Sequence, residues 1–259
     1  MRALITGAGN MGRAIAEALG ARGDEVVAMV GRPAPTSRPA ALAPVDVAFE
    51  FSAAAALQRN VDLALDSGCR ALVIGTTGWA NDPDARADLE RRLDSAGARA
   101  VVAPTFSLGA ILFTELAEQA ARLFGSFPAY DPYVFEHHRR TKPDRPSGTA
   151  LAVAERLLPH LRSKRRALLA TGSGAPEPDV LEVVALRAGA SPGMHIVGFD
   201  APGESFELRI TARDRSAYVA GALLAGDSLQ ADPDRTGITD FDQLIRERIA
   251  QSTGKADDR

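Results

Sequence analysis

Cysteine is nearly missing from this chain of 259 residues, and its scarcity excludes whole classes of protein. Cys69 has no second cysteine with which to form a disulfide or a thiolate zinc cluster. We therefore expect neither a disulfide scaffold nor a zinc-finger module, and a reducing compartment suits the sequence best.

Charge of one sign and long apolar runs are lacking as well. The 33 acidic and 30 basic residues leave a formal net charge of −3, which provides no overall field to attract nucleic acid or an anionic membrane. No apolar run approaches the ~20 residues that a membrane span needs, and the N-terminus has no signal-peptide layout. We expect a cytoplasmic protein without nucleic-acid or membrane partners, in which anions bind at local clusters of positive charge.

A glycine-rich turn follows the first strand-like run and opens a helical pattern. Gly7, Gly9 and Gly12 form a G-x-G-x-x-G motif, in which the first glycine permits a tight turn and the second lets the backbone approach a pyrophosphate. The third allows the helix to pack closely on the strand, with its N-terminus facing the phosphates. We expect Asn10 and Met11 to join the three glycines in binding a dinucleotide; a turn without a ligand is the alternative.

The choice between NADPH and NADH depends on the end of the second predicted strand. An NAD site has a carboxylate about 20 residues after the glycines, to accept hydrogen bonds from the ribose. Here that position is Gly31, and Arg32 follows it. A guanidinium can pair with a 2′-phosphate, so we expect NADPH to be preferred, with NADH as the second candidate. The alternative for Arg32 is a solvated loop residue.

The first hundred residues alternate strand-like and helical segments, which is typical of a parallel sheet with crossover helices. The expected strands are Ala3–Thr6, Glu25–Val30, Val47–Phe51, Ala71–Ile74 and Ala98–Ala103, and the expected helices are Arg13–Gly20, Ala54–Ser67 and Asp84–Gly97. Together with the glycine motif, this alternation predicts a Rossmann-type dinucleotide-binding domain.

After Pro104 the pattern changes to helices and consecutive strands. The expected helices are Ala110–Phe124 and Ser147–Leu161, and the expected strands are Tyr133–Glu136, Leu181–Arg187, His195–Asp200 and Ser205–Ala212. From Ser216 the chain turns helical again. We therefore expect an α/β protein in which residues 1–106 and 216–259 form the dinucleotide-binding domain. Residues 107–215 would form an α+β substrate-binding and oligomerisation domain with a mixed or antiparallel sheet.

The densest chemistry lies in residues 136–150, where two histidines stand among several basic side chains. Arg139, Arg140, Lys142 and Arg145 against Asp144 give a local charge near +3, which suits a small anionic molecule. Ser147, Gly148 and Thr149 fall where a helix starts, with Ser147 as its N-cap, so free backbone N–H groups can receive a carboxylate. A solvated basic turn and a simple helix cap are the alternatives.

Two other chemistries are disfavoured in this segment. Adjacent histidines on a strand, His137 and His138, point to opposite faces and cannot share a metal ion, and no cysteine or carboxylate cluster completes a site, so we expect no metal. A serine hydrolase is disfavoured because the sequence has no G-x-S-x-G elbow.

Residues 136–150 resemble the hallmark of the dihydrodipicolinate reductases, E-x-H-H-x-x-K-x-D-x-P-S-G-T-A. The matching positions are Glu136, His138, Lys142, Asp144 and Pro146–Ala150. The resemblance extends over nearly the whole chain: it also includes the glycine turn, Ile74–Gly78, Phe106–Gly109, and Arg187–Gly189 with His195.

The resemblance implies a role for each matching residue. His138 would be the proton donor, Lys142 would assist it and bind a substrate carboxylate, and Ser147, Gly148 and Thr149 would hold a carboxylate at the helix start. It further implies that the cofactor contacts Gly75, Thr76, Thr77, Phe106 and Arg215. It also implies a homotetramer and a cyclic dicarboxylate as substrate.

The sequence departs from the family pattern at three positions near the expected substrate. Arg139 stands where a second histidine is usual, Thr105 where asparagine is usual, and Ile210 where histidine is usual. Arg139 remains cationic and can bind a carboxylate bidentately. These changes affect fine substrate geometry more than the class of reaction.

The function expected from the resemblance is the NAD(P)H-dependent reduction of 4-hydroxy-tetrahydrodipicolinate in lysine and diaminopimelate biosynthesis. Two alternatives stay open. One is a related reductase that acts on another imine or amino-acid precursor. The other is a nucleotide-sensing homologue without catalysis, which would have no need of a proton donor such as His138.

Overall fold

A computed structural model describes the chain at residues 1–31, 44–80, 82–172 and 174–254. Its internal contacts divide the chain into unit 1, comprising Met1–Leu108 and Arg215–Arg259, and unit 2, comprising Gly109–Asp214. In the part of the chain that the structure describes, no helix is both long and apolar enough to cross a membrane.

Unit 1 is built on a six-stranded sheet in the order β11-β5-β4-β3-β1-β2, and every neighbouring pair is parallel. The strands are β1 (Arg2–Thr6), β2 (Glu25–Val30), β3 (Val47–Glu50), β4 (Ala71–Ile74), β5 (Arg99–Val102) and β11 (Gly237–Asp240). The first five confirm the predicted Rossmann-type alternation. β11 was not predicted.

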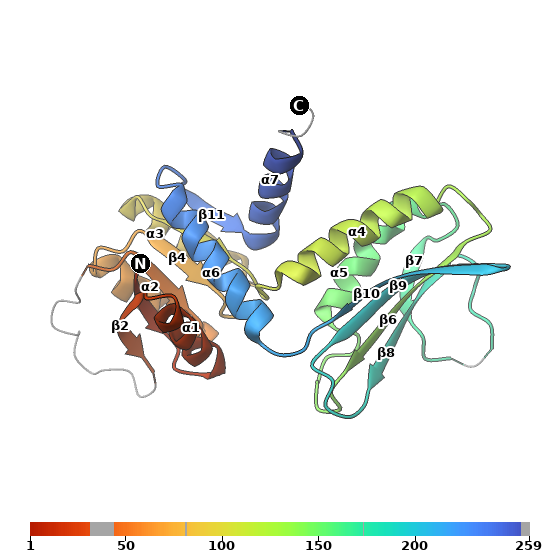
Figure 1. Ribbon diagram of the computed structural model, residues 1–259, viewed down its shortest axis with the longest axis horizontal. Coiled ribbons are helices and arrows are strands. Elements are labelled where there is room, and N and C mark those ends of the chain that lie inside the picture. The colour runs from red at the N-terminus through yellow and green to blue at the C-terminus, as the bar shows by residue number, and fades with distance from the viewer. Residues whose placement is uncertain (32–43, 81, 173, 255–259) are drawn as a thin grey trace. The chain divides into compact units, whose positions relative to one another are not determined.

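Helices cover both faces of this sheet (Figure 1). On one face lie α1 (Asn10–Ala21) and α6 (Ser216–Ala231), where Gly226 packs against Phe49 and Val47 of β3. On the other face lie α2 (Leu57–Asp66), preceded by the 3-10 turn η1 (Ala54–Ala56), and α3 (Pro83–Ala96), whose leucines pack on Leu4 and Leu72. α7 (Phe241–Gly254) follows β11. The carboxyl ends of β1, β3 and β4 all carry loops at one edge of the sheet, where parallel sheets bind their ligands.

Unit 2 is built on a five-stranded mixed sheet in the order β10-β9-β6-β8-β7. Its strands are β6 (Asp131–His138), β7 (Arg166–Leu169), β8 (Val180–Arg187), β9 (Met194–Ala201) and β10 (Glu204–Thr211). β6 pairs parallel with β8 and antiparallel with β9, as the prediction of a mixed sheet allowed. β7 was not predicted.

Two helices cover one face of that sheet and enclose its core (Figure 1). They are α4 (Leu108–Phe124) and α5 (Gly148–Leu157), and the short turn η2 (Leu158–His160) extends α5. Fully buried side chains from both layers form the core, among them Leu157, Leu181 and Phe199. This packing fixes the start of α5 against the end of β6, where the predicted catalytic segment lies.

Candidate active site

The glycine turn has the shape that a dinucleotide requires. Gly7 has a φ of +107°, and a Cβ there would lie 2.2 Å from the carbonyl oxygen of Phe51, so only glycine fits. A Cβ on Gly12 would lie 1.9 Å from the carbonyl oxygen of Gly7, whereas one on Gly9 would meet nothing within 4 Å. α1 begins at Asn10, so its free N–H groups open beside Gly9. Gly7 and Gly12 are thus required by close packing of the main chain, whereas the Cβ direction at Gly9 is open to a ligand.

A cavity of about 390 Å³ lies against this turn. Its lining comes from the β1–α1 turn, the end of β2 and the segment after β3: Gly7, Ala8, Gly9, Val30, Gly31, Phe51, Ser52, Ala53, Ala56, Arg59 and Asn60. Among the described residues that line it, Arg59 is the only charged one, and its Nη2 donates to Oδ1 of Asn60 at 3.4 Å. Arg32, the predicted partner of a 2′-phosphate, lies outside the described residues.

Behind the cavity lies a buried hydrogen-bond network around Glu50, which sequence reasoning missed although it named Thr76. The hydroxyl of Thr76 donates to Glu50 and accepts a hydrogen bond from the backbone N–H of Ser52 at 2.8 Å. Asn60 donates to Glu50 at 2.9 Å. Thr76 is 4% exposed, so it positions the cavity wall through Ser52 and its hydroxyl is already engaged.

The remaining predicted cofactor residues fall into two groups. Gly75 and Phe106 contact the wall: a Cβ on Gly75 would lie 2.1 Å from the ring of Phe51, and the buried ring of Phe106 lies 5.8 Å from the same ring. Thr77 and Arg215 are exposed, and Arg215 stands at the N-terminus of α6.

In unit 2, β6 carries the predicted proton donor. Burial alternates along the strand, so Glu136 and His138 face the helices while His137 is half-buried on the other side. Ser147 caps α5, as predicted, by accepting the N–H of Ala150 at 3.2 Å. Gly148 and Thr149 form the first turn of that helix, so their N–H groups are available to an anion.

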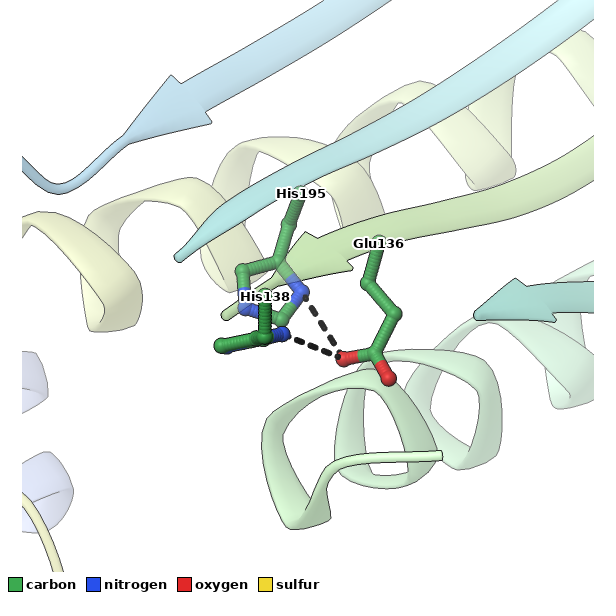
Figure 2. A group of neighbouring side chains, drawn as sticks. All are labelled: Glu136, His138 and His195. Carbon is green, nitrogen blue, oxygen red and sulfur yellow. Dashed lines mark ion pairs between the residues drawn. The ribbon is translucent and has the colours of Figure 1, made fainter. Parts of the chain in front are cut away.

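Glu136 is the centre of the hydrogen-bond network at this place. It is fully buried, and its Oε1 accepts the backbone N–H of Ser147 at 2.9 Å and Nη2 of Arg187 at 2.8 Å. Its Oε2 accepts the hydroxyl of Ser147. Figure 2 shows the same oxygen facing Nδ1 of His138 at 3.3 Å and Nδ1 of His195 at 3.9 Å.

Burial and neighbouring charges set the protonation of these three groups. Burial opposes the charged form of Glu136, but the hydrogen bonds from Ser147 and Arg187 hold the pKa of this carboxyl below its ordinary value. Burial lowers the pKa of His138, the carboxylate of Glu136 opposes this in part, and the charges of Lys142 and Arg187 add to the lowering. Glu136 is therefore ionised, and His138 is neutral over most of the range around pH 7.

His195 is the second imidazole beside Glu136. Its ring lies edge-on to that of His138, with centroids 5.1 Å apart. Burial and the neighbouring His138 lower the pKa of His195 to about 4, so this ring stays neutral. Ile210, one of the family departures, pairs with His195 across β10 and β9 and adds to the apolar surroundings.

The donor atoms of Glu136, His138 and His195 lie within 4.8 Å of one another, which is the geometry of a possible metal site. The expectation that no carboxylate completes a site with a histidine was therefore wrong: the partner histidine comes from β9, not from the adjacent His137. The oxygens of Glu136 already accept three hydrogen bonds, and Arg187 pairs with it. The positive charges of Arg187 and Lys142 would repel a metal cation at this place, so the absence of a metal stays our prediction.

The basic residues of the loop between β6 and α5 differ in their surroundings. Nζ of Lys142 pairs with Asp144 at 2.7 Å and is 22% exposed, so it is partly accessible to a ligand. Arg139 is exposed directly after β6. The structure thus brings Lys142, Ser147 and His138 to one end of β6, with Arg139 at its rim.

Sequence comparisons agree with this geometry. The family model for dihydrodipicolinate reductase, N-terminus, matches residues 1–106, and the model for dihydrodipicolinate reductase, C-terminus, matches residues 109–245. A 4-hydroxy-tetrahydrodipicolinate reductase from Methanopyrus kandleri is 38% identical over 192 residues, covering 74% of this chain and 68% of that protein. One from Anaeromyxobacter sp. is 36% identical over 217 residues, covering 82% and 77%.

Among solved structures, a dipicolinate-bound dihydrodipicolinate reductase from Paenisporosarcina sp. TG-14 superposes with a TM-score of 0.67. It is 21% identical and covers 93% of this chain and 97% of that chain, which shows a shared fold. With both family models matching in chain order and relatives above 30% identity, the chain belongs to the dihydrodipicolinate reductase family.

Proposed function

We infer that the chain is an NAD(P)H-dependent oxidoreductase that reduces 4-hydroxy-tetrahydrodipicolinate to tetrahydrodipicolinate in diaminopimelate and lysine biosynthesis. The observation that carries this inference is the end of β6: a buried imidazole, a lysine and a capped helix start lie together in one unit. The other unit has a cavity beside a phosphate-accommodating glycine turn.

Each of these groups has a role in the proposed reaction. The N–H groups of Gly148 and Thr149, at the helix start that Ser147 caps, bind one carboxylate of the substrate, while Lys142 and Arg139 bind the other. The hydroxyl of the substrate leaves as water, and the nicotinamide, when bound, would supply a hydride. His138 supplies the proton that completes the reduction, and such a donor contributes about 10² to 10⁴ in rate.

A coupled assay tests this function. The substrate is made in situ by its synthase, and oxidation of NADPH and of NADH is followed separately, for the wild type and for His138→Gln. We expect turnover by the wild type, and a kcat for the variant that is lower by roughly 10² to 10⁴ with unchanged nucleotide affinity. No oxidation of either nucleotide would reject the proposed substrate and favour another precursor or a nucleotide sensor. An unchanged kcat would remove His138 from the mechanism.

We propose NADPH as the preferred reductant, with NADH as the second. The support is the sequence at the end of β2, where Gly31 takes the place of a ribose-binding carboxylate and Arg32 follows. Arg59 adds a positive charge to the same cavity. A lower KM for NADH than for NADPH in the coupled assay would contradict this preference.

We also propose a cytoplasmic homotetramer assembled through unit 2. The support is the sheet face opposite α4 and α5, where Leu168 and Leu186 are 47% and 43% exposed. Light scattering should give four times the monomer mass, and Leu186→Glu should lower it. A wild-type monomer at micromolar concentration would contradict the assembly.

A further inference from the structure

The side chain of Glu136 has a task that the binding and proton-donating roles above leave open. It contacts both parts of the proposed substrate site: its oxygens accept two hydrogen bonds from Ser147, at the helix start, and Oε2 faces Nδ1 of His138 at 3.3 Å. Its side chain has no exposed surface, so water does not compete for these contacts. Figure 2 shows the carboxylate turned toward the imidazole nitrogens.

We propose that Glu136 is a positioning residue that holds His138 as the tautomer with its proton on Nδ1, so that Nε2 is the nitrogen that delivers the catalytic proton. This rests on the proposed role of His138 as the proton donor.

The argument begins with the acceptor. An ionised carboxylate only accepts hydrogen bonds, and the donors Ser147 and Arg187 keep Glu136 ionised. Nδ1 of His138 is buried and makes no hydrogen bond of good geometry to the described residues, but it lies 3.3 Å from this oxygen. A lone pair turned toward an anion would be repelled, so this nitrogen carries the hydrogen. In the neutral ring, Nε2 then has the lone pair. When the ring gains a second proton, that proton resides on Nε2, and its transfer to the substrate carbon returns the ring to the same neutral tautomer.

The other edge of the ring lies beside a residue that has no side chain. Nε2 of His138 lies against Gly193, and a Cβ there would be 3.0 Å away, so the absent side chain leaves the proton-donating nitrogen uncrowded. The φ of +153° at Gly193 is one that other residues rarely adopt. Nδ1 thus faces a fixed anion, while Nε2 faces a residue without a side chain.

The competing imidazole does not displace His138 from the carboxylate. His195 is 3.9 Å from the same oxygen, farther than His138 at 3.3 Å. Three other charged groups from two segments also bear on the titration of His138: Arg187 on β8, and Lys142 and Asp144 in the loop before α5. Of the charged groups around His138 in the described structure, only Glu136 lies within ion-pair distance of Nδ1.

Glu136→Gln separates positioning from a purely structural role. The amide oxygen of glutamine can still accept from Ser147 and Arg187, both of which are donors, so its NH₂ group turns toward His138. Nδ1 must then accept, and the neutral ring becomes the Nε2–H tautomer. The variant also loses the anion that favours the charged ring, so the pKa of His138 falls further.

The first experiment is ¹⁵N NMR of the imidazoles in the free wild type and in Glu136→Gln, with His138→Gln used to assign the signals. We expect the proton on Nδ1 in the wild type and on Nε2 in the variant. This measurement involves no substrate, so it tests the positioning even if the proposed reaction is wrong. A wild-type ring with its proton on Nε2, or the same tautomer in both proteins, would overturn the proposal.

The second experiment is the pH profile of kcat/KM in the coupled assay. Because His138 must be charged to donate, the rate falls as pH rises through its pKa. For Glu136→Gln we expect this fall about one pH unit lower, and a kcat at pH 7 reduced roughly 10-fold to 100-fold, with unchanged nucleotide affinity. A uniform loss without a shift of the profile would mean that the residue is only structural.

Two further variants keep the test decisive. Glu118→Gln removes another buried, arginine-paired carboxylate of unit 2, and we expect it to leave the profile in place while lowering stability. Glu136→Asp keeps the charge but withdraws it from Nδ1 by one methylene, and we expect an intermediate profile. If Glu136→Gln does not fold, the tautomer and profile of Glu136→Asp decide: wild-type values for both would overturn the proposal.

Discussion

Gly193 is the residue whose missing side chain has the most direct effect at the candidate site. A Cβ there would lie 3.0 Å from Nε2 of His138, closer than ordinary contact. A methyl group would therefore displace the imidazole or block the approach of a substrate to its reactive nitrogen. Its backbone carbonyl also accepts the N–H of Ala212 at 2.8 Å, so the main chain cannot easily move away.

We predict that Gly193→Ala lowers kcat at least 10-fold, since misplacement of a reacting group by a fraction of an ångström is costly. Nucleotide affinity should be unchanged. The control is Gly203→Ala, which also has a positive φ, +101°, and no atom within 4 Å of its added Cβ. The measurement is kcat of both variants in the coupled assay. An equal loss of kcat in the two variants would mean that backbone strain alone causes the loss, and would contradict the prediction.

Arg59 is the second residue with a testable consequence, because it is the charged side chain among the described residues that line the cavity of unit 1. We predict that Arg59→Ala weakens NADPH binding about 10-fold, the usual loss for one charge-assisted hydrogen bond. Titration with 2′,5′-ADP and 5′-AMP locates the contact: a loss for the first alone indicates the 2′-phosphate. Arg91→Ala, on the exposed side of α3, is the control. Wild-type affinity for both probes would contradict the prediction.

At the scale of elements, α4 and α5 are joined by an ionic cluster around the buried carboxylate of Glu118. Glu118 of α4 accepts Nε of Arg156 from α5 at 2.6 Å, and it pairs with Arg122 and with His160 of η2. Burial acts against the carboxylate, but these partners lower the pKa of Glu118 to about 2. The cluster fixes α5, the helix that Ser147 caps.

We predict that Glu118→Gln lowers the free energy of unfolding at pH 7 by about 3 kcal/mol, the usual loss when one partner of a buried pair is removed. Because the folded pKa is below the unfolded value, the wild type has this contribution above about pH 4.5 and loses it as pH falls toward 2. Urea unfolding should show a smaller difference in the free energy of unfolding between the wild type and Glu118→Gln at pH 3 than at pH 7. A constant difference would contradict the assigned pKa.

Elements with a clear apolar period were predictable from sequence, and short edge strands were not. β11 (Gly237–Asp240) and β7 (Arg166–Leu169) are four residues each and lie at sheet edges, where one neighbour suffices and little apolar pattern is needed. In the site, the shared face of Glu136 and His138 and the cap at Ser147 follow from local rules. The position of His195 does not, because it depends on the register between β9 and β6.

At the scale of the whole molecule, each unit has a hydrophobic core of its own. Unit 2 is one continuous stretch, Gly109–Asp214, whereas unit 1 is assembled from two stretches of chain. A continuous segment with its own core can fold by itself.

We predict that residues 109–214 alone fold and unfold cooperatively, as circular dichroism during urea titration would show. Removing unit 1 leaves the sheet and both covering helices intact, so the isolated unit should keep the wild-type tautomer of His138. Residues 1–108 alone are the comparison and should not give a cooperative transition. A non-cooperative titration of 109–214 would show that its core depends on unit 1.

The division of unit 1 into two stretches has a consequence for the order of events during synthesis. The strands β1 to β5 leave the ribosome first, yet the helix that covers Val47 and Phe49, α6, and the edge strand β11 come after unit 2. Until they arrive, the part of the sheet face that α6 covers and the open edge of β5 stay unprotected. Unit 2 can therefore finish folding before unit 1 has its last elements, α6, β11 and α7. During this interval the apolar surface of unit 1 is most accessible to other chains and to chaperones.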